Sequence, residues 1–350
     1  LEVTFNGSLA SSAFNSVTKI ETFKSGADTA SQAFTTADAN TAATESLTID
    51  MSAQATNGYT VNISNETNGA VTITGGAAAG TITLSSSSLG DTFTGGAGAD
   101  GVTVIAAQLT ADDTLNGAGG TDTLTIGTVG TLSDADFTNI SNFKELTLGD
   151  GINTVVVGAE FAGAGFTKIN EYDNNTTDAQ TITYGSGVNT AQEYALSRSS
   201  TTITATGMTS ALTVSGLEAY LTSADTITGG SGTDTLTVTF SGTAMSSSDL
   251  TNVTSIETFK TGSNHIGGFT FLDANFVSNN FSVDATATTG SAFTVDASAE
   301  DDSTMTYTGG GGVDTVTGTA TTATGDTITA GAGADIITGK GGGDTITGGA

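Results

Sequence analysis

Aspartates that follow glycine-rich hexamers are the residues of this chain whose spacing could do chemistry. The pattern is Gly-Gly-x-Gly-x-Asp-x-U-x, in which U is an apolar residue. It is intact at Gly95–Thr103, Gly229–Thr237 and Gly309–Thr317. One glycine is replaced at Gly117–Thr125, Ala330–Thr338 and Gly339–Thr347. Half copies of the form Asp-x-U-x begin at Asp91, Asp113, Asp225 and Asp326.

This pattern favours the binding of a hard divalent cation. Ca²⁺ takes roughly six to eight oxygen ligands at about 2.3–2.6 Å. A hexamer with three glycines can curl tightly because glycine adopts positive φ without strain, so its carbonyls can point at one centre. The aspartate adds a charged oxygen, and the loop stacked on it must supply the remaining ligands. The predicted metal-binding residues are Asp91, Asp100, Asp113, Asp122, Asp225, Asp234, Asp314, Asp326, Asp335 and Asp344, with the hexamers that begin at Gly95, Gly229, Gly309 and Gly339.

The spacing of these aspartates predicts which loops stack on one another. Loops on the same edge should recur after about 18 residues, or somewhat more where the chain carries an insertion. Four pairs meet this condition: Asp326 and Asp344 at 18 residues, Asp314 and Asp335 at 21, and Asp91 and Asp113, and Asp100 and Asp122, both at 22. Asp225 and Asp234 have no such partner, so their site is either absent or completed by residues outside the repeats.

One hexamer departs from the pattern at the residue that would carry the charge. Gly75–Thr83 aligns with Gly309–Thr317, but the third glycine has become Ala78 and the aspartate has become Gly80. We expect this coil to keep the fold and to bind no metal.

These nonapeptides resemble the RTX family, the hemolysin-type calcium-binding repeats that form parallel β-rolls. The resemblance implies Ca²⁺ as the cofactor, bound between stacked turns. Within that family, the Thr-, Ser-, Gly- and Asp-rich composition without cysteine is most similar to crystalline surface-layer proteins of Gram-negative bacteria. That likeness implies export by a type I secretion system and an extracellular location at the cell surface.

The elements that must position these loops are short strands. In the first third of the chain, strand-like segments recur at intervals of about 10 to 12 residues, with no room for a crossover helix. Hairpins in a sandwich would give similar spacing, but the aspartate hexamers favour an all-β, right-handed parallel β-solenoid or β-roll. Ser133–Asp136 and Ser246–Asp249 resemble capping boxes and predict short helical turns within it.

A longer repeat divides the chain into three modules. The segment 1–26 returns at 124–149 and again at 236–262. Residues 35–40 also match 270–275, and 46–53 match 280–287. The predicted modules are a partial one at 1–123 with RTX turns at 91–123, a second at 124–235, and a third at 236–350. The third ends in an RTX roll that we expect to continue beyond Ala350.

Charge narrows the choice of partners. Seven Lys and Arg face 36 Asp and Glu, giving a net charge of −29. Nucleic acid and anionic lipid both require basic patches, so neither is expected as a partner. No run of about 18 apolar residues is present, and membrane insertion is not expected. The expected partners are calcium ions and copies of the chain itself in a lattice or filament, with a cell-surface glycan bound through regions outside this chain.

Catalysis is not expected. The one histidine, His265, lies in a sequence typical of a loop and has no metalloprotease motif around it. The run Glu300–Asp302 is interpreted as a solvated loop. The sequence therefore predicts a calcium-dependent structural protein that self-assembles into an extracellular surface layer or filament. Two alternatives stay open: an extender segment of a large RTX adhesin, and a secreted carbohydrate-active enzyme on a β-helix.

Overall fold

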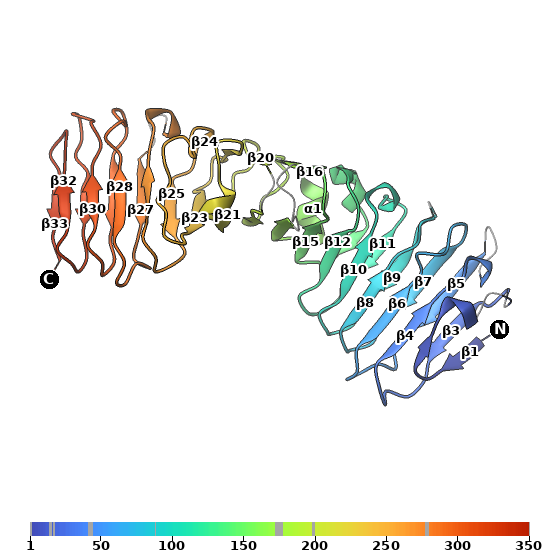
Figure 1. Ribbon diagram of the computed structural model, residues 1–350. Helices are drawn as coiled ribbons and strands as arrows, with labels where there is room; N and C mark the ends of the chain where they lie inside the picture. Colours follow the sequence, from blue (N-terminus) through green and yellow to red (C-terminus); the bar gives the residue numbers. More distant parts are fainter. Residues whose placement is uncertain are drawn as a thin grey trace. The chain divides into compact units, whose positions relative to one another are not determined.

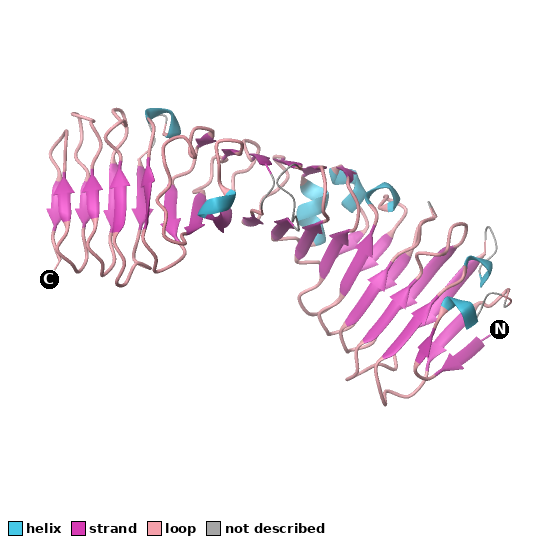
Figure 2. Ribbon diagram, in the orientation of Figure 1, coloured by secondary structure: helices cyan, strands magenta, loops and turns pink. Residues whose placement is uncertain are grey.

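The chain is a parallel β-solenoid, as predicted (Figures 1 and 2). The computed structural model describes residues 2–13, 16, 18–40, 45–87, 89–171, 178–197, 200–276 and 280–349. These residues divide into two compact units, 1–172 and 173–350. In each unit the strands that pair are not consecutive in the chain, because each coil contributes one strand to each of its faces.

The first unit has two long parallel sheets and a short third pairing. One sheet runs in the order β1 (Glu2–Phe5), β3 (Thr22–Ser25), β5 (Ser46–Asp50), β7 (Ala70–Thr74), β9 (Thr92–Thr94), β11 (Thr114–Asn116) and β14 (Ile140–Ser141). The other runs in the order β2 (Ser8–Leu9), β4 (Gln32–Thr35), β6 (Tyr59–Asn62), β8 (Gly80–Thr83), β10 (Gly101–Val104), β12 (Thr123–Ile126), β15 (Glu145–Leu148) and β17 (Lys168–Glu171). In addition, β13 (Gly130–Leu132) pairs with β16 (Asn153–Val157).

The second unit repeats this arrangement with three sheets. The longest runs in the order β19 (Gln192–Ala195), β21 (Leu212–Leu217), β23 (Thr235–Thr239), β25 (Thr258–Thr261), β27 (Phe281–Asp284), β29 (Met305–Thr308), β31 (Thr327–Thr329) and β33 (Thr345–Thr347). A second contains β18 (Ala179–Tyr184), β20 (Ser200–Thr204), β22 (Thr226–Thr228) and β24 (Val253–Thr254). A third contains β26 (Gly267–Thr270), β28 (Phe293–Asp296), β30 (Thr315–Thr317) and β32 (Ile336–Thr338).

Helical structure is confined to short segments. They are the α-helix α1 (Ala159–Ala164) and the 3₁₀ helices η1 (Ser11–Ala13), η2 (Asp38–Asn40), η3 (Ala106–Gln108), η4 (Asp134–Phe137), η5 (Glu218–Tyr220) and η6 (Asp273–Asn275). The predicted capping box begins η4, where the Ser133 backbone N–H and hydroxyl both donate to Asp136 Oδ2. Ser246 makes the same two bonds to Asp249, but there they close a turn instead of a 3₁₀ helix. Among the described residues, no helix is long and apolar enough to cross a membrane.

Each strand of a coil contributes a single layer of inward-facing side chains to the core. In the Thr-U-Thr strands the central apolar residue points inward, because successive side chains of a strand alternate between faces. Phe93, Ile227 and Ile328 are each 0% exposed, while the threonines beside them face outward and are half-buried or exposed. Stacked aromatic rings fill the wider coils: the ring centroids of Phe276 and Phe281 are 3.7 Å apart.

The longer sequence repeat corresponds to a structural repeat. Segments 35–40 and 270–275, which match in sequence, form η2 and η6. The matching strands β5 and β27 each place an aspartate beside a lysine of the preceding strand in the same sheet. These ion pairs join Lys24 to Asp50 at 3.5 Å and Lys260 to Asp284 at 3.1 Å. The two units therefore contain related scaffolds whose equivalent positions can be compared.

Candidate metal-binding turns

All ten predicted aspartates stand at equivalent positions in the solenoid. Each one directly precedes a strand, at the bend where a turn ends. Eight of them are between 0% and 4% exposed, and only Asp335 and Asp344, in the last coils, are half-buried. In every case the carboxylate Oδ1 accepts a hydrogen bond from a backbone N–H of the preceding coil. The aspartates thus form ladders along the edges of the solenoid.

The four predicted stacking pairs are confirmed. The Asp100 backbone N lies 2.7 Å from Asp122 Oδ1, and the Asp91 backbone N lies 2.8 Å from Asp113 Oδ1. The Asp314 backbone N lies 2.9 Å from Asp335 Oδ1, and the Asp326 backbone N lies 2.9 Å from Asp344 Oδ1. The equal spacing of the first two pairs indicates two edges of one roll. Asp91 and Asp113 precede paired strands of one sheet, and Asp100 and Asp122 precede paired strands of the other.

The second carboxylate oxygen, Oδ2, holds the turn of its own coil in shape. In the full hexamers it accepts the N–H of the second glycine, at 3.1 Å from Gly96 to Asp100 and 2.6 Å from Gly230 to Asp234. In the half copy at Asp225, the N–H of Thr222 donates at 2.7 Å. The aspartate is therefore a structural closure of the turn as well as a candidate ligand.

The first glycine of each hexamer lies where oxygens from two coils converge. A Cβ on Gly95 would clash with Asp100 Oδ2 of its own turn and with the Gly117 carbonyl oxygen of the next. A Cβ on Gly309 would clash with Asp314 Oδ2 and the Ala330 carbonyl oxygen. A Cβ on Gly229 would clash with Asp234 Oδ2 and the Ser255 carbonyl oxygen. Gly339 lies against Asp344 Oδ2. A charged oxygen and a carbonyl oxygen meeting at one point are the mixed donor set that Ca²⁺ prefers.

The Asp122 carboxylate has one oxygen that no hydrogen bond from the described residues satisfies. Its Oδ2 is buried and has no hydrogen-bond partner among the described residues. Both this oxygen and the Asn142 carbonyl oxygen lie within 3 Å of where a Cβ of Gly117 would be. Burial raises the pKa of Asp122 to about 6, the charge of Asp100 adds to the shift, and Lys144 opposes it. An orphaned buried oxygen beside a carbonyl fits a calcium ion, which would favour the ionised form.

Six other buried aspartates have raised pKa values for the same reason. Burial raises the pKa of Asp91 to about 6. It also raises the pKa values of Asp100, Asp113, Asp225, Asp234 and Asp314. Backbone N–H donors lower each of these values but do not overcome the desolvation. The ladder is therefore a row of carboxylates whose charged forms are penalised by their burial.

Asp234 has an acidic partner that the sequence did not reveal. The Asp234 backbone N–H donates to Glu257 Oε2 at 2.8 Å, so Glu257 takes the place of the next aspartate on this edge. Burial and the nearby charge of Asp234 raise the pKa of Glu257. The separation of 23 residues was the available signal, but Glu257 lies outside any glycine hexamer. For Asp225, the coil that stacks next presents Thr251 at the equivalent position.

The coil without an aspartate keeps the fold, as predicted. Gly80 begins β8, and its backbone N–H donates to Asp100 Oδ1 at 2.6 Å. The ring of Tyr59 fills the space where a side chain on Gly80 would lie, and its hydroxyl donates to the same oxygen at 3.2 Å. A phenol thus replaces one carboxylate of the ladder, which suits the expectation that this coil binds no metal.

Two segments outside the turns were also interpreted from sequence. His265 is exposed in the loop before β26, as predicted. The interpretation of 300–302 as a solvated loop is wrong at one residue. Asp301 and Asp302 are exposed, but Glu300 is 0% exposed, because its side chain folds inward against the backbone of its own turn.

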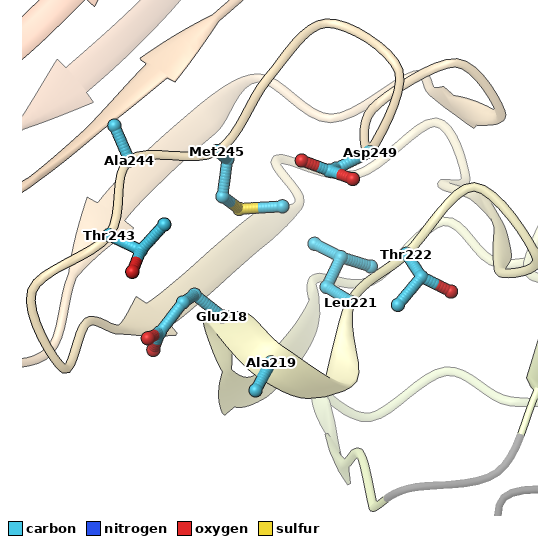
Figure 3. Close-up of a pocket in the computed structure, with 8 residues that line it drawn as sticks. All are labelled: Glu218, Ala219, Leu221, Thr222, Thr243, Ala244, Met245 and Asp249. Atoms are coloured by element: carbon cyan, nitrogen blue, oxygen red, sulfur yellow. The ribbon is translucent and has the colours of Figure 1, made fainter.

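A surface cavity of about 220 Å³ in the second unit offers little to a carbohydrate substrate (Figure 3). Its two acids are Glu218 and Asp249. The Glu218 carboxylate accepts the Ser241 hydroxyl, and Asp249 is bonded to Ser246. None of the eight residues that line the cavity is aromatic, so it has no stacking platform for a sugar ring.

Gly95→Ala tests the convergence of oxygens. The added methyl group would clash with Asp100 Oδ2 and the Gly117 carbonyl, and we expect a loss of about 1–3 kcal/mol in unfolding free energy. Gly101→Ala is the matched control, because a Cβ there meets nothing within 4 Å. Urea denaturation in calcium should separate the two variants, and equal stability would contradict the packing described here.

Acidification tests the buried ladder. Because the folded pKa values of Asp91 and Asp122 are about 6 against an ordinary 3.8, their stabilising effect is complete below pH 3.8 and is lost as pH rises through 6. The calcium-free chain should therefore show more β-structure by circular dichroism at pH 5 than at pH 8. Asp50 and Asp284, whose pKa values are lowered, do not change charge in this window. Asp122→Asn should weaken the dependence, and a calcium-free chain that loses structure on acidification would refute it.

A family model of calcium-binding repeats matches parts of the chain that contain most of these aspartates. The family model described as RTX calcium-binding nonapeptide repeat (4 copies) matches residues 110–126, 221–238 and 321–350. The matched ranges contain seven of the ten aspartates, and the hexamers at 95–100 and 309–314 lie outside them. No curated protein and no solved structure matches the chain. The chain therefore carries RTX calcium-binding nonapeptide repeats within a parallel β-solenoid.

Proposed function

We propose that this chain is a calcium-dependent structural protein that is secreted, folds outside the cell and self-assembles into a surface layer or filament. The observation that carries the calcium-dependent part is the ladder of buried aspartates, whose second oxygens converge with carbonyls of the next coil. The RTX repeats support secretion, because proteins that carry them are typically secreted.

The fold couples calcium to folding through its own carboxylates. A net charge of −29 and burial of aspartates both oppose the compact state when cations are scarce. Calcium, when bound, neutralises these charges and supplies a common ligand to adjacent coils. The residues that would hold it are the aspartates of the hexamers, through Oδ2, and the residue of the next coil whose carbonyl oxygen meets it. Asp122 with Asn142, and Asp100 with Gly117, are the clearest pairs.

Folding is then linked to location. Since the sites require stacked coils, they do not exist in the unfolded chain, and the free energy of calcium binding becomes free energy of folding. A chain that stays loose in a low-calcium cytosol suits export by a type I system, and millimolar extracellular calcium suits weak sites of this kind.

Assembly is supported by the surface of the solenoid. Outward-facing threonines stand in register along the longest sheet of the second unit, as in the row Thr306, Thr327 and Thr345. Such rows give a face of short hydroxyl side chains, beside the Lys260–Asp284 ion pair, that can lie against a copy of itself.

Calcium titration tests the folding step. Circular dichroism should change from coil to β-structure as calcium is added. Asp122→Asn keeps the Oδ1 acceptor and removes the charge, and we expect it to raise the calcium midpoint about threefold to tenfold. Asp112→Asn is the control, because Asp112 is exposed and belongs to no ladder. A fold that is unchanged by calcium would contradict the proposal at its first step.

Electron microscopy tests the assembly step. Negatively stained protein should show ordered sheets or filaments in millimolar calcium and lose them on adding EGTA. A chain that folds with calcium but stays monomeric would refute self-assembly and favour the adhesin extender. Hydrolysis of a polysaccharide that depends on one carboxylate outside the nonapeptides would favour the enzyme.

A further inference from the structure

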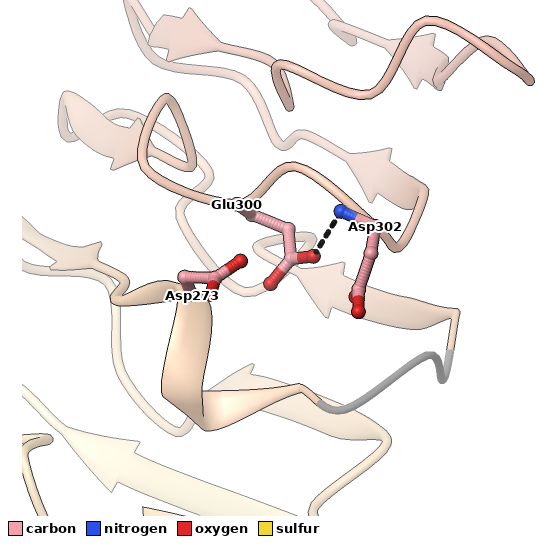
Figure 4. A group of neighbouring side chains, drawn as sticks. All are labelled: Asp273, Glu300 and Asp302. Atoms are coloured by element: carbon pink, nitrogen blue, oxygen red, sulfur yellow. Dashed lines mark hydrogen bonds between the residues drawn. The ribbon is translucent and has the colours of Figure 1, made fainter.

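Three carboxylates outside the glycine-aspartate turns meet at one point of the second unit. Asp273 begins η6, and Glu300 and Asp302 lie in the turn that follows β28 (Figure 4). One carboxylate oxygen from each lies within 4.8 Å of the other two. Oxygens on opposite sides of a calcium ion are about 5 Å apart, since each Ca–O distance is about 2.3–2.6 Å. This separation therefore fits three ligands of a common ion.

Glu300 supplies the observation that distinguishes this cluster from a chance gathering of acids. Its side chain is 0% exposed, and Oε1 accepts the backbone N–H of Asp302 at 3.0 Å and of Ser303 at 2.8 Å. Oε2 is also buried, yet it has no hydrogen-bond partner in the part of the chain that the structure describes. Figure 4 shows this oxygen pointing toward Asp273. A buried carboxylate oxygen without a partner is costly, and a cation in front of it would remove the cost.

The first unit contains the same scaffold, with a different residue at one of the three acidic positions. Glu66 is 0% exposed, and its Oε1 accepts the backbone N–H of Asn68 at 3.2 Å and of Gly69 at 3.0 Å, as Glu300 does. Asp38 corresponds to Asp273 and accepts a backbone N–H from the same turn at 3.0 Å. Asn68 stands where the second unit has Asp302.

That substitution changes what the cluster can bind. The Asn68 amide donates to Asp38 Oδ1 at 3.3 Å, so an N–H occupies the space between the two side chains. Asp302 cannot donate in this way when ionised, and it brings a third negative charge instead. In the first unit an amide thus bridges to Asp38, whereas the second unit brings a third carboxylate to the same place.

We propose that Asp273, Glu300 and Asp302 form a further calcium site that fastens η6 to the neighbouring coil. All three side-chain donors are carboxylate oxygens, and hard cations such as Ca²⁺ prefer oxygen donors. Two of the three acids are exposed, which leaves room for water to complete the coordination. This site does not depend on the nonapeptide turns or on assembly.

Calcium content per chain tests this site. The full chain is dialysed to equilibrium against saturating CaCl₂, and bound calcium is measured by elemental analysis. Asp273→Asn and Glu300→Gln should each lose one ion, while the exposed neighbour Asp301→Asn should lose none. Asn68→Asp supplies the missing third carboxylate in the first unit and should gain one ion. Asp122→Asn, measured alongside, reports on the nonapeptide sites separately.

The outcomes are distinct. If Glu300→Gln disrupts the fold, circular dichroism in calcium will show it, and Asp273→Asn then decides, because the Asp273 side chain is exposed. Unchanged calcium content in Asp273→Asn would overturn the site. Loss of an ion from Asp301→Asn as well would show that the effect is one of general charge, and would overturn it equally.

Discussion

Each coil that carries a nonapeptide aspartate depends on the hydrogen bond from a backbone N–H of the preceding coil to that carboxylate. The bond places a charged group at the buried edge of the fold, where a turn and a strand meet. Its two oxygens serve different needs: Oδ1 joins coil to coil, and Oδ2 closes the turn and faces the carbonyls of the following coil. Because desolvation penalises the charge, the same group that gives the coil its shape also creates the demand for a cation.

The strand pattern follows from that arrangement. A coil with an aspartate at each bend has space for only one inward side chain between bends, and the Thr-U-Thr strands meet this limit. This is why the positions of strands and stacking pairs could be predicted from the sequence. The residue after each of these aspartates begins a strand, and the spacing of 18 to 22 residues is the length of one coil within the repeats. The glycines were also informative, since a Cβ at Gly95 or Gly309 would meet oxygens of two coils.

The sequence did not reveal residues whose role depends on how neighbouring coils stack, because no local motif marks them. Glu257 joins the ladder because β25 happens to stack on β23, and no hexamer marks it. Glu300 lies in an acidic run that is typical of a solvated loop, but the turn after β28 folds its side chain under the backbone N–H groups of Asp302 and Ser303. Burial of a single acid within a polar run depends on which coil lies next to it. The sequence of the run alone does not contain that information.

The related scaffolds of the two units show how this fold varies its affinity for cations without changing its shape. At Gly80 a ladder position has lost its aspartate, and the Tyr59 ring and hydroxyl take over its space and its hydrogen bond. At Asn68 an amide replaces a carboxylate and bonds directly to Asp38. In both cases a neutral hydrogen-bond donor takes the place of a carboxylate, and the coil is retained. An acid kept at such a position is therefore a sign of a site, and the buried second oxygens of Asp122 and Glu300 have no hydrogen-bond partner in the described chain.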